Sequence, residues 1–112
     1  TAEVVPVRAE LAGLTGTVSV FEPDRPGGRI VIELTNVPDA PAGHHYAVWV
    51  LRPGEEVEME PVGAFTPADG RARLELSLPG PGEYVALDIS VEEDGGSPEH
   101  SGTSLAGATL DA

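Results

Sequence analysis

Three histidines are the side chains of this 112-residue chain best suited to bind a transition metal, because it contains no cysteine. His44 and His45 are adjacent and open an apolar segment that has the pattern of a β-strand. Adjacent side chains of a strand point to opposite faces, so these two cannot bind one ion there. The sequence does not place His100 near either of them. We expect structural or solvent-exposed roles for all three, with a metal site as the less favoured alternative, and no cofactor.

Acidic residues gather around a Gly-Gly turn near the C-terminus. Residues 92–94 (Glu-Glu-Asp) precede Gly95 and Gly96, and Glu99 follows. A calcium ion needs about six to eight oxygen ligands around one point, and the alternating ligands of a dedicated calcium loop are missing here. We therefore expect a solvated acidic loop, because runs of charge usually lie in water. We interpret a second acidic group in the same way: Glu56, Glu58 and Glu60.

The sequence offers little support for catalysis. A chain without cysteine has no thiol nucleophile, and no Gly-x-Ser-x-Gly elbow occurs. Ser101 follows His100, with Asp94 close in sequence, but triads are defined by geometry in space and not by adjacency. Pairs of carboxylates can be chosen anywhere among the 19 acids, so they specify no acid–base site. We predict that the protein is not an enzyme.

The charge of the chain restricts its partners. Its 19 acids and six basic residues give a formal net charge of -13. Such a charge repels phosphate backbones and anionic lipid headgroups, so we expect neither nucleic-acid binding nor adsorption to a membrane surface. No apolar run of about 18 residues could cross a membrane, and no signal peptide is visible. We expect that Thr1 is not the natural start and that the chain is a piece of a longer protein.

The spacing of apolar residues predicts short β-strands along the whole chain. Turn signals recur about every 8–14 residues, the rhythm expected of a β-sandwich, and no long segment has a helical period. Alternation is clearest where Val85, Leu87, Ile89 and Val91 share one face. We predict one all-β domain over residues 1–112, an antiparallel β-sandwich of seven or eight strands with immunoglobulin-like architecture.

The expected strands differ in character. The first two are expected to form a hairpin, and the acidic strand over residues 56–60 suits a sheet edge. Residues 61–65 are expected to cross over to the next strand. The strand over residues 45–51 is apolar on both faces, which favours a central position, with Trp49 as the anchor of the core. The expected strands cover residues 4–11, 17–22, 29–34, 45–51, 56–60, 71–78, 84–91 and 105–110.

Two blocks of the sequence resemble a known protein family. Near the C-terminus an aliphatic strand ends in acids and is followed by Gly-Gly-Ser-Pro at residues 95–98 and by a last apolar strand. Upstream, residues 37–49 resemble the pattern LP-x-x-P-x-G-x-x-Y-x-x-W, and a Gly-x-Phe follows at residues 63–65. In this order the blocks resemble the C-terminal domain family of anti-sigma-K factors. A Pro after the acid and a Thr before Gly102, common in that family, are absent here.

The resemblance implies the extracytoplasmic domain of a membrane-anchored anti-sigma factor. In that family a cytoplasmic segment binds the sigma factor and one helix crosses the membrane; both would lie upstream of Thr1. Regulated proteolysis releases the sigma factor, so we expect a sensory or protease-gating module whose partners are proteins or proteases at the cell surface. We expect structural roles for the signature residues, because glycine permits unusual backbone angles and aromatic side chains fill the interior: Tyr46, Trp49, Gly95, Gly96, Ser97 and Pro98.

A second hypothesis remains open from the sequence. The chain could be a secreted or cell-surface β-sandwich that binds a cation, a glycan or a protein and has no connection with sigma factors. The negative charge would steer a cationic partner toward it. The parent reading frame distinguishes the two hypotheses, because only the first requires a membrane helix upstream of Thr1.

Overall fold

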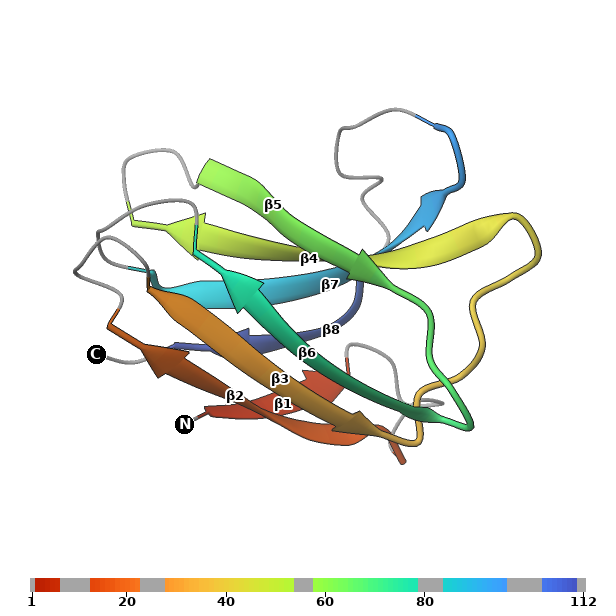
Figure 1. Cartoon of the computed structure of the whole chain (residues 1–112), viewed down its shortest axis with the longest axis horizontal. Coiled ribbons are helices and arrows are strands. Elements are labelled where there is room, and N and C mark those ends of the chain that lie inside the picture. Colours follow the sequence, from red (N-terminus) through yellow and green to blue (C-terminus); the bar gives the residue numbers. More distant parts are fainter. Residues whose placement is uncertain are drawn as a thin grey trace.

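The computed structural model describes residues 2–6, 13–22, 28–53, 58–78, 84–96 and 104–110. Within these ranges every regular element is a β-strand (Figure 1), and no helix is long and apolar enough to cross a membrane. The eight strands are β1 (Ala2–Pro6), β2 (Thr15–Phe21), β3 (Arg29–Thr35), β4 (His44–Arg52), β5 (Glu58–Phe65), β6 (Arg71–Ser77), β7 (Ala86–Glu93) and β8 (Ser104–Thr109).

The strands form two layers, and every strand pairing in the described ranges is antiparallel (Figure 1). One layer has the order β2-β3-β6 and the other the order β8-β7-β4-β5. β1 joins them, because residues 2–4 pair with β2 and residues 5–6 pair with β8. The predicted antiparallel sandwich and the pairing of the first two strands are therefore confirmed.

A continuous apolar core fills the space between the two layers. It forms because each strand turns alternate side chains inward, as the period of two in the sequence predicts. On β3 the inward residues are Ile30, Ile32 and Leu34, and on β7 they are Leu87 and Ile89; none is more than 2% exposed. Burying each such aliphatic side chain contributes about 1.5–3 kcal/mol relative to leaving it exposed.

β4 is central in its layer, as predicted, but its two faces have different roles. Tyr46, Val48 and Val50 face the apolar core. Trp49 is also buried, at 5% exposure, yet it does not belong to that core cluster. Its neighbours on the strand, Val48 and Val50, point toward the three-stranded layer. The Trp49 indole therefore points away from that layer, on the outer side of the four-stranded layer. The prediction that Trp49 anchors the core between the layers is therefore wrong, although its burial is confirmed.

β5 is longer than expected, and it is an edge strand. The predicted crossover over residues 61–65 is wrong, because β5 pairs with β4 up to Phe65. A proline is tolerated in an edge strand, and a register shift between Val48 and Trp49 accompanies Pro61. The predicted edge position of the acidic segment is confirmed for residues 58–60; residues 54–57 lie outside the described ranges.

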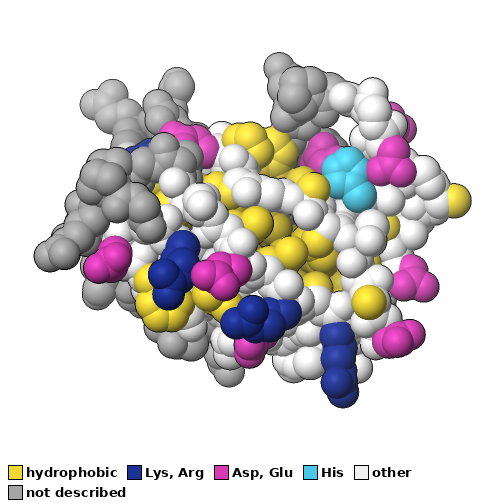
Figure 2. All heavy atoms as spheres, in the orientation of Figure 1, with side chains coloured by type: hydrophobic (Ala, Val, Ile, Leu, Met, Phe, Trp, Pro, Cys, Tyr) yellow, Lys and Arg dark blue, Asp and Glu magenta, His cyan; other side chains and the backbone are white. Residues whose placement is uncertain are grey.

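β5 and β6 are the two ends of the strand order. They approach each other where Leu76 packs over Gly63. The contact is so close that a Cβ on Gly63 would lie 2.7 Å from a Leu76 methyl carbon. Half-buried apolar side chains next to this approach pack against the core, among them Val62 and Leu74. Hydrophobic atoms are accordingly visible in the middle of the face shown in Figure 2. The glycine of the Gly-x-Phe motif thus permits the two layers to meet.

Candidate functional site

The outward side of the four-stranded layer carries a group of hydrogen-bonded polar side chains from β4, β7 and the turn after β7. Antiparallel register places Trp49 opposite Asp88, and His45 opposite Glu92. Directly opposed residues share a face of the sheet. We call five of the side chains gathered here the polar strip; they are His45, Trp49, Ser90, Glu92 and Asp94.

Trp49, Ser90 and Glu92 form a buried chain of hydrogen bonds. The indole Nε1–H of Trp49 donates to Ser90 Oγ at 2.8 Å, and the Ser90 hydroxyl donates to Glu92 Oε2 at 2.6 Å. Ser90 is fully buried and Glu92 is only 7% exposed. A distance of 2.6 Å is typical of a hydroxyl that donates to a carboxylate. The serine hydroxyl therefore connects the indole to a buried carboxylate.

Glu92 corrects the prediction of a solvated acidic loop. The strand extends to Glu93, so Glu92 is part of the ladder and its side chain lies against the sheet. Glu93 and Asp94 are exposed, as expected for charge runs. Glu99 lies outside the described residues. The Ser90 hydroxyl compensates for the burial of the Glu92 carboxylate by donating a hydrogen bond to it.

His45 and Asp94 extend the polar strip toward solvent. The Nδ1 atom of His45 lies 2.6 Å from Asp94 Oδ1, and the two side chains are 29% and 61% exposed. The backbone N–H of Asp94 donates to the carbonyl of Gly43 at 2.8 Å. These contacts hold the end of β7 against the turn that precedes β4. An exposed pair of this kind contributes at most about 1 kcal/mol.

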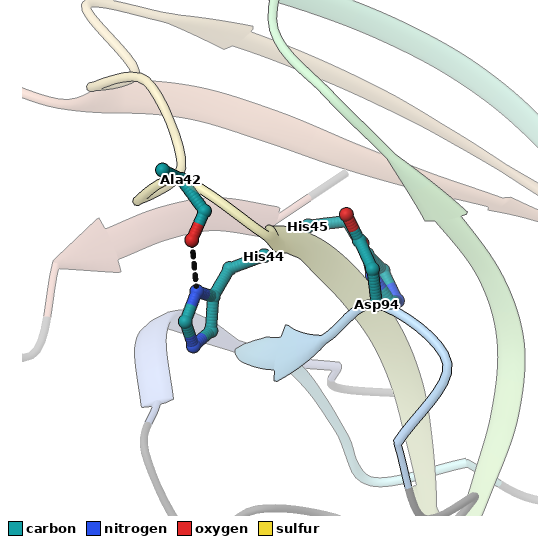
Figure 3. A network of polar contacts seen from close by, with 4 residues as sticks. All are labelled: Ala42, His44, His45 and Asp94. Atoms are coloured by element: carbon teal, nitrogen blue, oxygen red, sulfur yellow. Dashed lines mark hydrogen bonds and ion pairs between the residues drawn. The ribbon is translucent and has the colours of Figure 1, made fainter.

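His44 and His45 point in different directions, as predicted for adjacent strand residues. Figure 3 shows the His44 ring beside the carbonyl of Ala42, while His45 lies beside Asp94. The distance from His44 Nδ1 to the Ala42 oxygen is 2.9 Å. Within the described ranges no three His, Asp or Glu side chains converge as metal ligands. His100 and Ser101 lie outside those ranges.

Tyr46 explains the upstream sequence motif. Its hydroxyl donates to the carbonyl of Pro38 at 2.6 Å, and its ring contacts Phe65 with centroids 5.5 Å apart. Burial raises the pKa of Tyr46, and the nearby carboxylate of Asp39 raises it further. Gly43 adopts a φ of 76°, which glycine tolerates best. The motif therefore describes a corner in which the tyrosine ties the loop to the start of β4.

The downstream Gly-Gly pair also has a structural role. Gly95 has a φ of 71°, and the N–H of Gly96 donates to the carbonyl of Glu93 at 3.1 Å. A Cβ on Gly96 would lie 3.2 Å from that carbonyl oxygen, closer than a side chain normally allows. These two glycines end β7 in a tight turn. Ser97 and Pro98 lie outside the described residues.

Sequence reasoning missed the connection between Trp49, Ser90 and Glu92. The signal was present, because Asp88, Ser90 and Glu92 alternate with the inward residues of β7. It could not be used without the register that places Ser90 beside β4. Trp49, Ser90 and Glu92 use their polar groups to hydrogen-bond to one another. Such a pattern is typical of a structural network.

Comparison with known proteins identifies a family. The family model described as "Anti-sigma-K factor rskA, C-terminal" matches residues 2–104 of the chain. No curated protein and no solved structure matches the chain significantly. The family match covers all the strand-forming segments up to the start of β8.

Proposed function

Since this chain belongs to the family of anti-sigma-K factor C-terminal domains, we propose that it is the extracytoplasmic sensory and protease-gating domain of a membrane-anchored anti-sigma factor. In this proposal a cytoplasmic segment outside this chain binds the sigma factor, and a transmembrane helix lies upstream of Thr1. Its partners are proteins or proteases at the cell surface. The observation that carries the proposal is the family match over residues 2–104.

The position of β1 suggests how such a domain could control cleavage. β1 is the first strand after the proposed stem, and it pairs over only a few residues with each layer. A segment held in a ladder resists proteolysis, whereas a segment that opens locally becomes a substrate. Release of β1 would therefore lengthen the accessible stem without unfolding the rest of the sandwich. A ligand or partner would act by shifting this local equilibrium.

The immunoglobulin-like architecture is part of the same proposal. If β2, β3 and β6 correspond to strands A, B and E, then β4, β7 and β8 correspond to C, F and G. The observed orders β2-β3-β6 and β4-β7-β8 agree with this correspondence. β1 and β5 would be additions to these six strands. The correspondence supports a Greek-key sandwich to which β1 is an additional strand.

A sigma-dependent reporter in cells that carry the parent protein tests the gating. The double variant Glu3→Pro/Val4→Pro removes one backbone N–H from each edge of β1, because successive N–H groups point to opposite sides of a strand. We expect higher reporter output from this variant. Ile89→Ala is the matched control, since it costs about 2–5 kcal/mol in the core and leaves β1 unchanged. Equal output from two variants of equal stability would contradict gating by β1.

The extracytoplasmic location has a separate test. This domain contains no cysteine, so Met59→Cys introduces a thiol at an exposed position of β5, and the unsubstituted parent protein is the control for thiols elsewhere. We expect a membrane-impermeant maleimide to label this variant in intact cells that carry the parent protein. Labelling only after cell lysis would rule out the proposed location. The hypothesis of a binding module unrelated to sigma factors is disfavoured by the family membership.

A further inference from the structure

The outward side of the three-stranded layer contains a hollow of about 260 Å³. Register places the facing residues in three rows across β2, β3 and β6. The middle row contains Ser19, Val31 and Glu75. Along β3, Val31 is the short side chain between the longer Arg29 and Glu33 on the same face. The hollow forms because the rows on both sides carry larger groups; its remaining lining residues are Thr17, Phe21, Arg29, Glu33 and Arg73.

Paired charges form the walls of this hollow. Arg73 Nε lies 3.2 Å from Glu33 Oε1, and Arg29 Nε lies 3.3 Å from Glu75 Oε1. The guanidinium of Arg29 also lies over the ring of Phe21, at 4.9 Å from its centroid. The four paired side chains are 50% to 63% exposed, so each pair favours this arrangement by at most about 1 kcal/mol. In Figure 2 arginine and acidic side chains alternate along the lower part of the molecule, over β3 and β6.

The charge balance of the hollow favours neither a simple anion nor a simple cation as its ligand. The chain as a whole carries -13, whereas two arginines and two glutamates line the hollow, so its walls are neutral overall. An anion would approach Glu33 and Glu75, and a cation would approach Arg29 and Arg73. Each guanidinium retains further N–H donors, and each carboxylate retains acceptor positions. The hollow therefore offers donors and acceptors side by side without a net field.

An uncharged polyhydroxyl ring matches this combination. Neighbouring hydroxyls of a sugar can accept from a guanidinium and donate to the carboxylate beside it. The hydroxyl of Thr17 adds a group that donates or accepts, and Val31 with the Phe21 ring offers apolar surface to C–H groups. The volume is slightly below the roughly 300–1,000 Å³ of typical small-molecule sites. One sugar residue, open to solvent on one side, is therefore the appropriate size.

We propose that the hollow lined by Val31, Phe21 and the Arg29–Glu75 and Arg73–Glu33 pairs binds one residue of a neutral saccharide. This inference goes beyond the proposed function and does not depend on it. The site lies on the layer opposite the polar strip, on strands that pair with one another independently of β4. Such a shallow, half-open site is expected to bind weakly, with a Kd of about 1–10 mM.

Titration of the isotope-labelled chain, followed by amide chemical shifts, tests the proposal. The neutral probes are cellotriose, maltotriose and N,N′-diacetylchitobiose, and the charged probes are inorganic phosphate and a triarginine peptide. We expect at least one neutral probe to saturate, with shifts concentrated in β2, β3 and β6. The proposal is overturned if only charged probes bind, if the shifts lie on other strands, or if no neutral probe saturates by about 50 mM.

A substitution inside the hollow provides a second test of saccharide binding. Val31→Phe fills the floor from the outward side and should weaken saccharide binding at least about tenfold. Met59→Phe is the matched control, because it enlarges an exposed side chain on β5 and should leave binding unchanged. If Val31→Phe does not fold, Glu75→Gln replaces it, since this change removes the charge that pairs with Arg29 and keeps the size. Unchanged affinity in a folded hollow variant would overturn the proposal.

Discussion

The hydrogen bond between Trp49 and Ser90 offers the sharpest test of the polar strip. Trp49→Phe removes the indole donor and keeps an aromatic ring in its place. Ser90→Ala removes the acceptor of that bond and also the hydroxyl that donates to Glu92. If the two side chains act as one unit, the double variant must cost less than the sum of the single variants.

The expected magnitudes follow from the geometry. Trp49→Phe loses one hydrogen bond, worth about 0.5–1.5 kcal/mol, and about 50 Å² of aromatic burial, worth about 1 kcal/mol. The total is about 2 kcal/mol. Ser90→Ala leaves the indole N–H without this acceptor in a site that is 5% exposed and should cost about 2–3 kcal/mol. Either single substitution removes the Trp49–Ser90 hydrogen bond, so the sum of the two costs includes this bond twice. We therefore expect a coupling energy of about 1 kcal/mol between the two positions.

Urea unfolding followed by far-ultraviolet circular dichroism measures all four free energies of unfolding, because it does not require the indole as a probe. Thr35→Ala combined with Trp49→Phe is the control cycle, since Thr35 bonds Thr15 on the other layer and should be additive. A coupling of Trp49 with Ser90 below about 0.3–0.5 kcal/mol, the usual error of additivity, would refute the proposed chain of hydrogen bonds.

Three further predictions concern the fold. Because burial raises the pKa of Tyr46 above its ordinary value of 10.0, the protonated tyrosine favours folding. Its contribution is complete below about pH 10 and is lost as the pH rises toward the folded-state pKa; urea midpoints should show this loss in the wild type and not in Tyr46→Phe. Gly95→Ala should cost about 1–2 kcal/mol because φ is positive, whereas Gly13→Ala, where a Cβ meets nothing within 4 Å, should change the melting temperature little. Ile32→Ala should cost about 2–5 kcal/mol by urea unfolding, and a loss below 1 kcal/mol would contradict its 0% exposure.

The strands could be predicted from the sequence because alternation fixes both the type of element and its inward face. On β3 and β6, Ile30 and Leu74 alternate with charged residues, and the structure places the apolar set toward the core. A period of two is a local property of the chain, so no knowledge of neighbours is needed. This is why the antiparallel sandwich was predictable without any structural information.

β4 shows where that reasoning stops. Both of its faces are apolar, so alternation could not tell whether Val48 or Trp49 points to the other layer. The choice depends on register with β7, which is a long-range property. The size of the indole predicts a place in the core, but a buried indole also needs a partner for its N–H. Ser90 supplies that partner on the outward side.

Two further errors came from local rules applied without context. Residues 61–65 are predicted to cross over to the next strand, but proline is tolerated at a sheet edge, and β5 is such an edge and includes Pro61. Glu92 is predicted to lie in solvent with its acidic neighbours, but the same alternation that buries Ile89 places Ser90 and Glu92 together on the outward face. Residues of three strands line the hollow on the three-stranded layer, so its prediction requires the β2–β3 and β3–β6 registers together. The sequence of any one strand carries no signal for it.

The most direct test of the gating hypothesis is to lock β1 in place within the parent protein. Glu3 and Thr17 are directly opposed in the β1–β2 register, at a spacing that a disulfide can bridge, and the chain has no cysteine of its own. The double variant Glu3→Cys/Thr17→Cys can therefore be compared in its oxidised and reduced forms by following cleavage of the stem on immunoblots. We predict that the oxidised lock slows cleavage severalfold and that reduction restores it. Equal cleavage rates in the two forms would contradict the account.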